Sequence, residues 1–144
     1  MPLTFKKVES IAEFIDAIRI RVDVFIKEQG FQPGWEPDED DKIATQYIAL
    51  LDGKIVATAR TREIAPCEFK IERMAVQKEH RGKGIGKKLL SYTIEELNEV
   101  NPKRIFLRSQ VQAQKFYEKY GFKPISTPLD SYGVQHIDMQ LSVK

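Results

Sequence analysis

Three glycines at every second position, surrounded by basic side chains, form the stretch best suited to bind an anion. In EHRGKGIGKKLL (79–90) the glycines are Gly82, Gly84 and Gly86. Glycines let backbone N–H groups approach an anion closely, and the start of the helix expected next adds a positive dipole end. Lys87 and Lys88 would oppose that dipole by about 0.3–1 kcal/mol each unless an anion binds there. The stretch predicts a phosphate-binding loop, with a tight basic turn as the alternative.

Two common phosphate-binding motifs do not fit these residues. A nucleoside-triphosphate loop requires G-x-x-x-x-G-K-[ST], but Arg81 and Lys88 stand where glycine and Ser or Thr are needed. A dinucleotide fold requires G-x-G-x-x-G, but Lys87 occupies the third glycine position. What remains is a strand, a glycine loop and a helix.

The hydrophobic pattern predicts the elements that position this loop. Ser10 and Glu13 form a capping-box pattern, so a helix should start there and continue through apolar residues as far as Phe25. Asp52-Gly53 lies between two strand-like runs in residues 45–62, as in a tight hairpin. Further strands are expected at 3–8, 69–76, 103–109, 122–126 and 134–143, and further helices at 86–99 and 113–120. The order predicts a mixed sheet with helices packed against it.

The composition is that of an ordinary globular protein and excludes several classes. The 144 residues fit one domain, and no apolar run is long enough to span a bilayer. The N-terminal residues lack a secretory signal, and the single Cys67 cannot form an internal disulfide, so we expect a cytoplasmic protein. A net charge of +2 gives no support for nucleic-acid binding. The acidic stretch EPDEDD (36–41) is interpreted as a surface loop, or else as an attractor for cationic acceptors.

Three motifs in a fixed order resemble the GNAT superfamily of N-acetyltransferases. VQKEHRGKGIGKKLL resembles the family's Q/R-x-x-G-x-G/A loop, IERMAV its preceding strand and AQKFYEKYGF its C-terminal helix. RVDVFIKEQG (21–30), the acids after it and GVQHIDM (133–139) further resemble an ElaA-like branch of that superfamily. The resemblance implies an α/β (α+β) fold in one domain, 1–144. Its mixed central sheet would have about six to seven strands, flanked by about four helices.

The same resemblance implies acetyl-CoA as co-substrate and no metal. The pyrophosphate would lie on the loop formed by Arg81, Gly82, Lys83, Gly84, Ile85, Gly86 and Lys87. The pantetheine arm would pair with the backbone of Met74, Ala75 and Val76, where one N–H would polarise the thioester carbonyl. Gln110 matches a position that contacts the pantetheine in relatives, with a helix-capping role as the alternative.

Two residues are candidates for proton transfer. Tyr117 matches the tyrosine that protonates the departing thiolate in many relatives, although it could also be a core aromatic residue. Glu72 is a candidate base, because Met74, two residues further on, lies on the same side of the strand. The neighbouring Arg73 is expected on the opposite side, where it could meet an acidic substrate. Glu72 and Arg73 could equally be members of structural ion pairs.

The acceptor pocket is expected between the first helical segment and the C-terminal strands. The candidate acceptor-binding residues are Arg21, Phe25, Glu28, Gln29, Arg73 and His136. Arg21 could bind a substrate carboxylate or form a salt bridge, and His136 could be structural or act in a proton relay.

The sequence as a whole predicts an acetyl-CoA-dependent N-acyltransferase in which an amine attacks the thioester directly. The acceptor would be a small-molecule or protein amine, with no nucleic-acid or membrane partner, and exposed C-terminal strands make a homodimer reasonable. A CoA-binding regulatory module without turnover and an acyl-homoserine-lactone synthase-like enzyme remain the alternatives.

Overall fold

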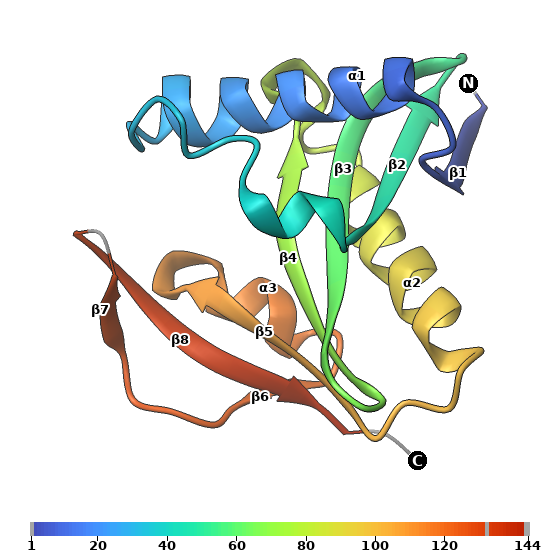
Figure 1. The fold of residues 1–144 in the computed structure, drawn as a ribbon. Coiled ribbons are helices and arrows are strands. Elements are labelled where there is room, and N and C mark those ends of the chain that lie inside the picture. Colours follow the sequence, from blue (N-terminus) through green and yellow to red (C-terminus); the bar gives the residue numbers. More distant parts are fainter. Residues whose placement is uncertain (1, 132, 143–144) are drawn as a thin grey trace.

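The computed structural model describes residues 2–131 and 133–142, which form one mixed eight-stranded sheet with helices on both faces (Figure 1). The strands are β1 (Leu3–Lys7), β2 (Thr45–Leu51), β3 (Lys54–Ala65), β4 (Glu68–Val76), β5 (Arg104–Gln110), β6 (Phe122–Pro124), β7 (Leu129–Ser131) and β8 (Val134–Leu141). The α-helices are α1 (Ile11–Arg21), α2 (Ile85–Asn98) and α3 (Gln114–Glu118). The shorter helical turns are η1 (Val22–Glu28), η2 (Glu39–Lys42), η3 (Lys78–His80) and η4 (Val111–Ala113).

Local sequence signals explain where the first elements begin and turn. The Ser10 hydroxyl accepts a hydrogen bond from the Glu13 N–H at 3.1 Å and caps α1. Asp52 and Gly53 have φ angles of 52° and 79°, the left-handed pair that a tight hairpin needs between β2 and β3. Both signals were predicted from the sequence, and both predictions are confirmed.

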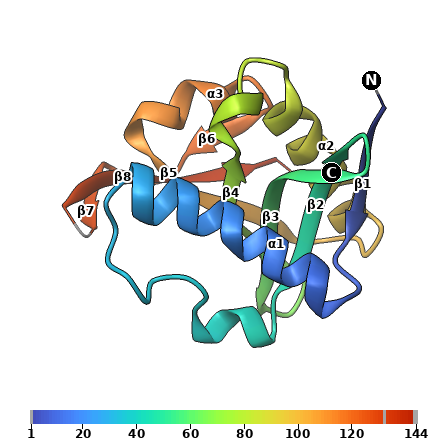
Figure 2. The same ribbon diagram turned by 90° about the horizontal axis from the view of Figure 1, so that it is seen from above.

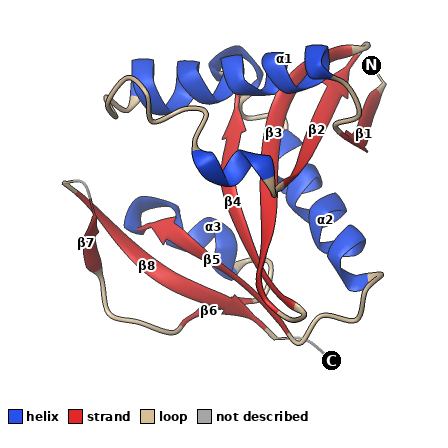
Figure 3. Cartoon of the chain, in the orientation of Figure 1, coloured by secondary structure: helices blue, strands red, loops and turns tan. Residues whose placement is uncertain are grey.

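The helices divide between the two faces of the sheet. Figure 2 shows α1 on one face, with α2 and α3 on the other. Under α1, Ile20 packs with Val24 of η1 and Ala75 of β4. On the opposite face, the buried Leu89 and Leu90 of α2 belong to two different apolar clusters. Figure 3 shows the same fold in the orientation of Figure 1, with helices, strands and loops distinguished by colour.

The predicted mixed α/β fold is confirmed, with small differences in the elements. The sheet follows the order β1-β2-β3-β4-β5-β8-β6, and β7 pairs with β8 as the eighth strand. The sequence did not predict β7, because the turn-forming residues Pro128 and Gly133 lie close to its ends and Asp130 lies within it. The described part of the chain contains three α-helices rather than about four, and η1 continues α1 directly. Val143, the last residue of the predicted C-terminal strand, lies outside the described residues.

Strands β4 and β5 separate halfway along their length. Their parallel pairing covers only the positions from Glu68 with Arg104 to Ile71 with Leu107. Beyond these positions β4 continues to Val76 and β5 continues to Gln110. The backbone edges that the two strands turn towards each other are not paired with each other there. Within the described residues, 2–131 and 133–142, no helix is both long enough and apolar enough to cross a membrane.

The central position of Leu90 leads to a stability prediction. Its side chain is 0% exposed between α2 and the sheet. We expect Leu90→Ala to lower the free energy of unfolding by about 2–5 kcal/mol, because the smaller side chain leaves a cavity that the surrounding residues cannot fully close. Ile43→Ala is the control, because Ile43 is 74% exposed and its loss should stay within about 0.5 kcal/mol. Urea denaturation measures both, and equal losses in the two variants would contradict this packing.

Candidate active site

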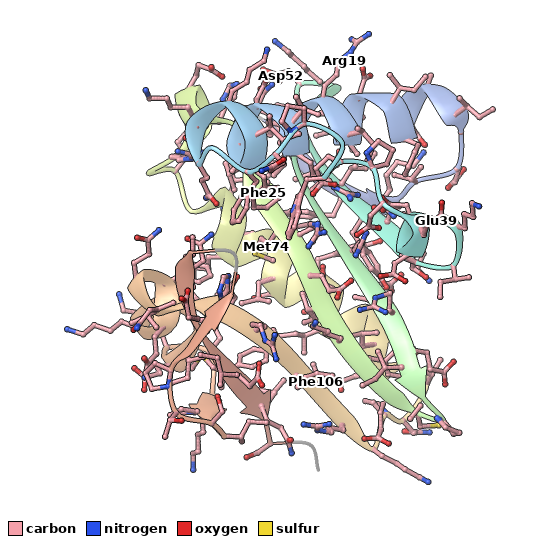
Figure 4. The ribbon with its side chains drawn as sticks, turned by 60° about the vertical axis from the view of Figure 1, so that its left-hand side comes forward. Arg19, Phe25, Glu39, Asp52, Met74 and Phe106 are labelled. Carbon is pink, nitrogen blue, oxygen red and sulfur yellow. The ribbon has the colours of Figure 1, made fainter. Side chains whose placement is uncertain are left out.

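A cavity of about 280 Å³ lies where β4 and β5 separate. Its walls come from η1 and the loop after it, the C-terminal parts of β4 and β5, the turn η4, α3 and β8. The predicted site residues that line it are Phe25, Gln29, Glu72, Arg73, Met74, Gln110, Tyr117 and His136. Figure 4 shows Phe25 of η1 close to Met74 of β4. Arg21 and Glu28 do not line this cavity.

The glycine loop presents free backbone N–H groups to solvent. Gly82 and Gly84 have φ angles of 81° and 78°, and a Cβ added at either would meet no atom within 4 Å. Helix α2 begins at Ile85 without a side-chain cap and without an acidic residue in its first turn. In the described chain, no backbone N–H from 82 to 87 donates a hydrogen bond to the protein. This geometry fits an oxyanion.

The loop also lies against the other parts of the site. A Cβ at Gly86 would be 3.4 Å from Val76 and 4.0 Å from Phe116, so the start of α2 touches the end of β4 and α3. The Arg81 guanidinium donates a hydrogen bond to the Val76 carbonyl at 3.0 Å and pairs with the Glu28 carboxylate at 2.8 and 2.9 Å. Glu28 therefore tethers the loop to η1.

Tyr117 places a half-buried phenol at the cavity. Its ring makes edge contacts with Phe116 and Phe122. Burial raises the pKa of Tyr117 to about 12, so the hydroxyl stays protonated at neutral pH. Among the described residues the hydroxyl has no hydrogen-bond partner, which leaves its proton available to a ligand.

Glu72 is the centre of an ion-pair cluster. Its carboxylate lies 2.8 Å from Arg60, 2.7 Å from Arg62 and 3.2 Å from Lys70. Burial alone would raise the pKa of Glu72, but these hydrogen bonds and charges lower it to about 2. A carboxylate with that pKa has little affinity for a proton at neutral pH, so the geometry favours the ion-pair alternative over the role of base.

Arg73 lies on the same side of the sheet as Glu72, not on the opposite side as predicted. The register of β3 and β4 shifts between Thr58 and Arg60, and Arg73 has a φ of 53°. This β-bulge breaks the alternation of side chains. Arg73 donates a hydrogen bond at 2.9 Å to Asp38, which also pairs with Arg60 at 2.7 Å. The guanidinium also lies 5.4 Å from the centre of the Trp35 ring.

The acidic stretch 36–41 lies partly at the surface, as interpreted from the sequence, but two of its carboxylates point inward and are buried. The side chain of Glu36 is 0% exposed and that of Asp41 is 5% exposed. Arg21, itself 0% exposed, donates hydrogen bonds to both carboxylates. Sequence reasoning missed this role because the arginines come from distant positions. For Arg21 the geometry favours the salt-bridge alternative.

Gln110 and His136 are adjacent across β5 and β8. The two residues are partners in the strand register, and Gln110 donates a hydrogen bond to the Gln29 side chain at 2.8 Å. Phe31 and Trp35, which also line the cavity, stack with ring centres 5.1 Å apart. These two aromatic residues were not predicted as site residues, because they lie in an irregular loop that has no periodic pattern. In the described part of the chain, no group of His, Cys, Asp or Glu side chains is suited to hold a metal ion.

Comparisons with known proteins agree on one family. Residues 16–143 match the family model described as an acetyltransferase (GNAT) domain. The chain is 31% identical over 140 residues to the uncharacterized protein YyaT of Bacillus subtilis, covering 95% of this chain and 94% of YyaT. It is 30% identical over 126 residues to the uncharacterized N-acetyltransferase YjcF of the same organism, covering 86% and 89%. The crystal structure of Escherichia coli ElaA aligns with a TM-score of 0.88 at 25% identity, covering 98% of this chain and all of that one.

The charge cluster leads to a prediction about acid stability. The pKa of Glu72 is about 2 in the folded chain and 4.5 ordinarily, so its stabilising effect is complete above about pH 4.5 and is lost as the pH falls towards 2. Glu72→Gln removes the carboxylate that Arg60 and Arg62 share, while Arg60 keeps Asp38 and Asp41, and we expect it to cost about 1–3 kcal/mol at neutral pH. The loss of stability between pH 4.5 and 2 should be smaller in this variant.

Glu39→Gln is the matched control, because Glu39 belongs to the same acidic stretch but its side chain is 87% exposed. We expect a change of less than about 0.5 kcal/mol. Urea denaturation from pH 7 to pH 2 provides both comparisons. Equal stability of Glu72→Gln and the unaltered chain across this range would contradict the structural role of Glu72.

Proposed function

Since the chain belongs to the GNAT acetyltransferase family, we propose that it transfers an acetyl group from acetyl-CoA to an amine. One observation carries the proposal: the free N–H groups of the glycine loop and the half-buried Tyr117 flank the same unpaired end of β4. A phosphate cradle and a proton donor at one open strand edge are what a coenzyme A thioester requires.

The donor would lie along the glycine loop and β4. The N–H groups from Gly82 to Lys87 would hold the pyrophosphate, with Lys83 and Lys87 near the outer phosphates. The open edge formed by Met74, Ala75 and Val76 would pair with the pantetheine arm, and one N–H there would stabilise the charge developing on the carbonyl oxygen. Gln110, at the end of β5, would contact the same arm. Acetyl-CoA would supply the acetyl group as an activated thioester.

Tyr117 would be the acid of the reaction. As the amine nitrogen attacks the thioester carbon, the C–N bond forms and the C–S bond breaks, and the phenol passes its proton to the sulfur. The burial that keeps Tyr117 protonated also makes a free thiolate costly in the same pocket. No metal and no covalent bond to the protein would be required.

The acceptor would enter on the side of η1 and β8. Phe25, Gln29, Arg73 and His136 line this side of the cavity. Arg21 and Glu28 would act indirectly, Arg21 through the acidic stretch and Glu28 through Arg81. A cavity of about 280 Å³ has room for a small amine or for the side chain of a protein lysine.

The anion-binding role of the loop can be tested with two variants at Gly84. Its φ of 78° is a conformation that Asn and Asp tolerate better than other residues do. We expect Gly84→Asp to weaken acetyl-CoA binding at least 10-fold more than Gly84→Asn, because only the Asp carboxylate repels a pyrophosphate. Isothermal titration measures both affinities. Equal affinities for the two variants, or no binding by the unaltered chain at millimolar acetyl-CoA, would contradict the proposed donor site.

The acid role of Tyr117 predicts a specific loss in Tyr117→Phe. We expect kcat for acetyl transfer to fall about 10²–10⁴-fold, because the phenol proton is missing. The acetyl-CoA affinity should change little, because the ring remains in place. Thiol release with a panel of amines measures the rate, and isothermal titration measures the affinity. An unchanged rate with intact binding would contradict the acid role of Tyr117, whereas acetyl-CoA binding with no transfer by the unaltered chain would support a CoA-binding module without turnover.

A further inference from the structure

We propose that His136 is the base that removes the proton from the acceptor's ammonium group. This inference rests on the proposed function and assigns the step that Tyr117 cannot perform. An ammonium group has no lone pair, so it must lose one proton before its nitrogen attacks the thioester.

The hydrogen bond at the His136 ring fixes which nitrogen is available. The Nδ1 atom lies 2.9 Å from the Val134 carbonyl oxygen. A carbonyl oxygen only accepts hydrogen bonds, so Nδ1 carries the hydrogen and donates it. In the neutral ring the lone pair is therefore on Nε2. Within the part of the chain that the structure describes, Nε2 has no hydrogen-bond partner, so it is free to accept a proton.

His136 also stands between the two cavities of this face. It lines the cavity that contains Met74 and Tyr117, and it lines an adjoining one of about 270 Å³ that extends over Arg62 and Lys70. An amine that enters through the second cavity would pass the imidazole before it reaches the donor side.

The carboxylates that line these cavities are less suited than His136 to accept a proton. Glu72 is held by three cations at 2.7 to 3.2 Å. Asp38 accepts hydrogen bonds from Arg60 and Arg73 at 2.7 to 3.1 Å. Asp40 lies 3.6 Å from Arg62 and lines only the second cavity, away from Met74 and Tyr117.

The remaining titratable or charged groups that line the two cavities are a phenol and five cationic side chains. The pKa of Tyr117 is raised by burial, so the phenol holds its own proton and is not a base for the ammonium. The cations that line the two cavities are Arg60, Arg62, Lys70, Arg73 and Arg108. Arg108 is paired with Asp138 at 2.8 Å. Among the described residues that line both cavities, His136 is thus the one titratable side chain with a lone pair that no cation or hydrogen-bond donor occupies.

The proton balance is complete with these two residues and solvent. Nε2 of His136 takes one proton from the ammonium and later releases it to water. The freed nitrogen lone pair forms the C–N bond, and the C–S electron pair leaves with sulfur, which takes the proton of Tyr117. The second proton of the attacking nitrogen passes through solvent and restores the phenol.

The kinetic test compares the pH dependence of kcat/KM in the unaltered chain and in His136→Gln. We expect kcat/KM of the variant to be about 10²–10⁴-fold lower than that of the unaltered chain. We also expect the decrease of kcat/KM at acid pH, which protonation of His136 causes in the unaltered chain, to be absent from the variant. Added imidazole should restore part of the rate. Gln135→Ala, an exposed neighbour on the same strand, is the control and should keep the normal profile. Acetyl-CoA affinity, measured by isothermal titration, should stay within about twofold in both variants.

A second readout does not depend on activity. The chain has two histidines, so ¹⁵N NMR of the unaltered chain and of His136→Gln assigns the His136 ring directly. At a pH where the ring is neutral we expect hydrogen on Nδ1 and none on Nε2. Hydrogen on Nε2 would overturn the proposal.

The outcomes separate this proposal from the function on which it rests. A rate in His136→Gln within threefold of the unaltered chain would overturn the role of His136 alone. A large loss with an unchanged acid limb would also overturn it, since that pattern indicates a positioning role. If the unaltered chain binds acetyl-CoA but transfers the acetyl group to none of the amines tested, both proposals are overturned. Should His136→Gln fail to fold by circular dichroism, His136→Asn replaces it.

Discussion

The separation of β4 from β5 is the constraint on which the rest of the structure depends. Pairing ends after Ile71 and Leu107, yet both strands continue, so the backbone edge of β4 is left open in the middle of the sheet. Unpaired backbone groups inside a protein are costly unless a partner satisfies them. A ligand that pairs with this edge would supply the missing hydrogen bonds, and the glycine loop, the phenol of Tyr117 and the proposed acceptor wall all lie around it.

Buried ion pairs hold β4 in the shape that this opening needs. Arg73 adopts a left-handed φ that a non-glycine residue rarely takes, and its guanidinium is tied to Glu36 and Asp38. Arg60 connects Asp38, Asp41 and Glu72, so the acidic stretch and the bulged strand form one network. Breaking one member of such a network leaves a buried charge without its counterion. The cluster therefore ties the acidic stretch to the wall of the cavity.

The sequence predicted the features that depend on local patterns. The capped start of α1, the Asp52-Gly53 hairpin and the glycine loop each follow from residues within a few positions of one another. It did not predict the partners of the acidic stretch, because Arg21, Arg60 and Arg73 meet it only in the folded chain. Nor did it predict the bulge, since alternation along a strand gives no sign that Arg73 turns to the side of Glu72. The roles of Arg21 and Glu72 were left open for the same reason.

Strand β4 can take part in both halves of the proposed reaction because its backbone and its side chains point in different directions. The hydrogen-bonding edge of a strand lies in the plane of the sheet, while the side chains extend perpendicular to it. The open edge from Met74 to Val76 is thus available to the donor whatever side chains these residues carry. The side chains of Glu72 and Arg73 are free to join the ion pairs behind the acceptor wall. In the proposed reaction, donor recognition through backbone groups would leave the side chains around η1 and β8 to determine which amine is accepted.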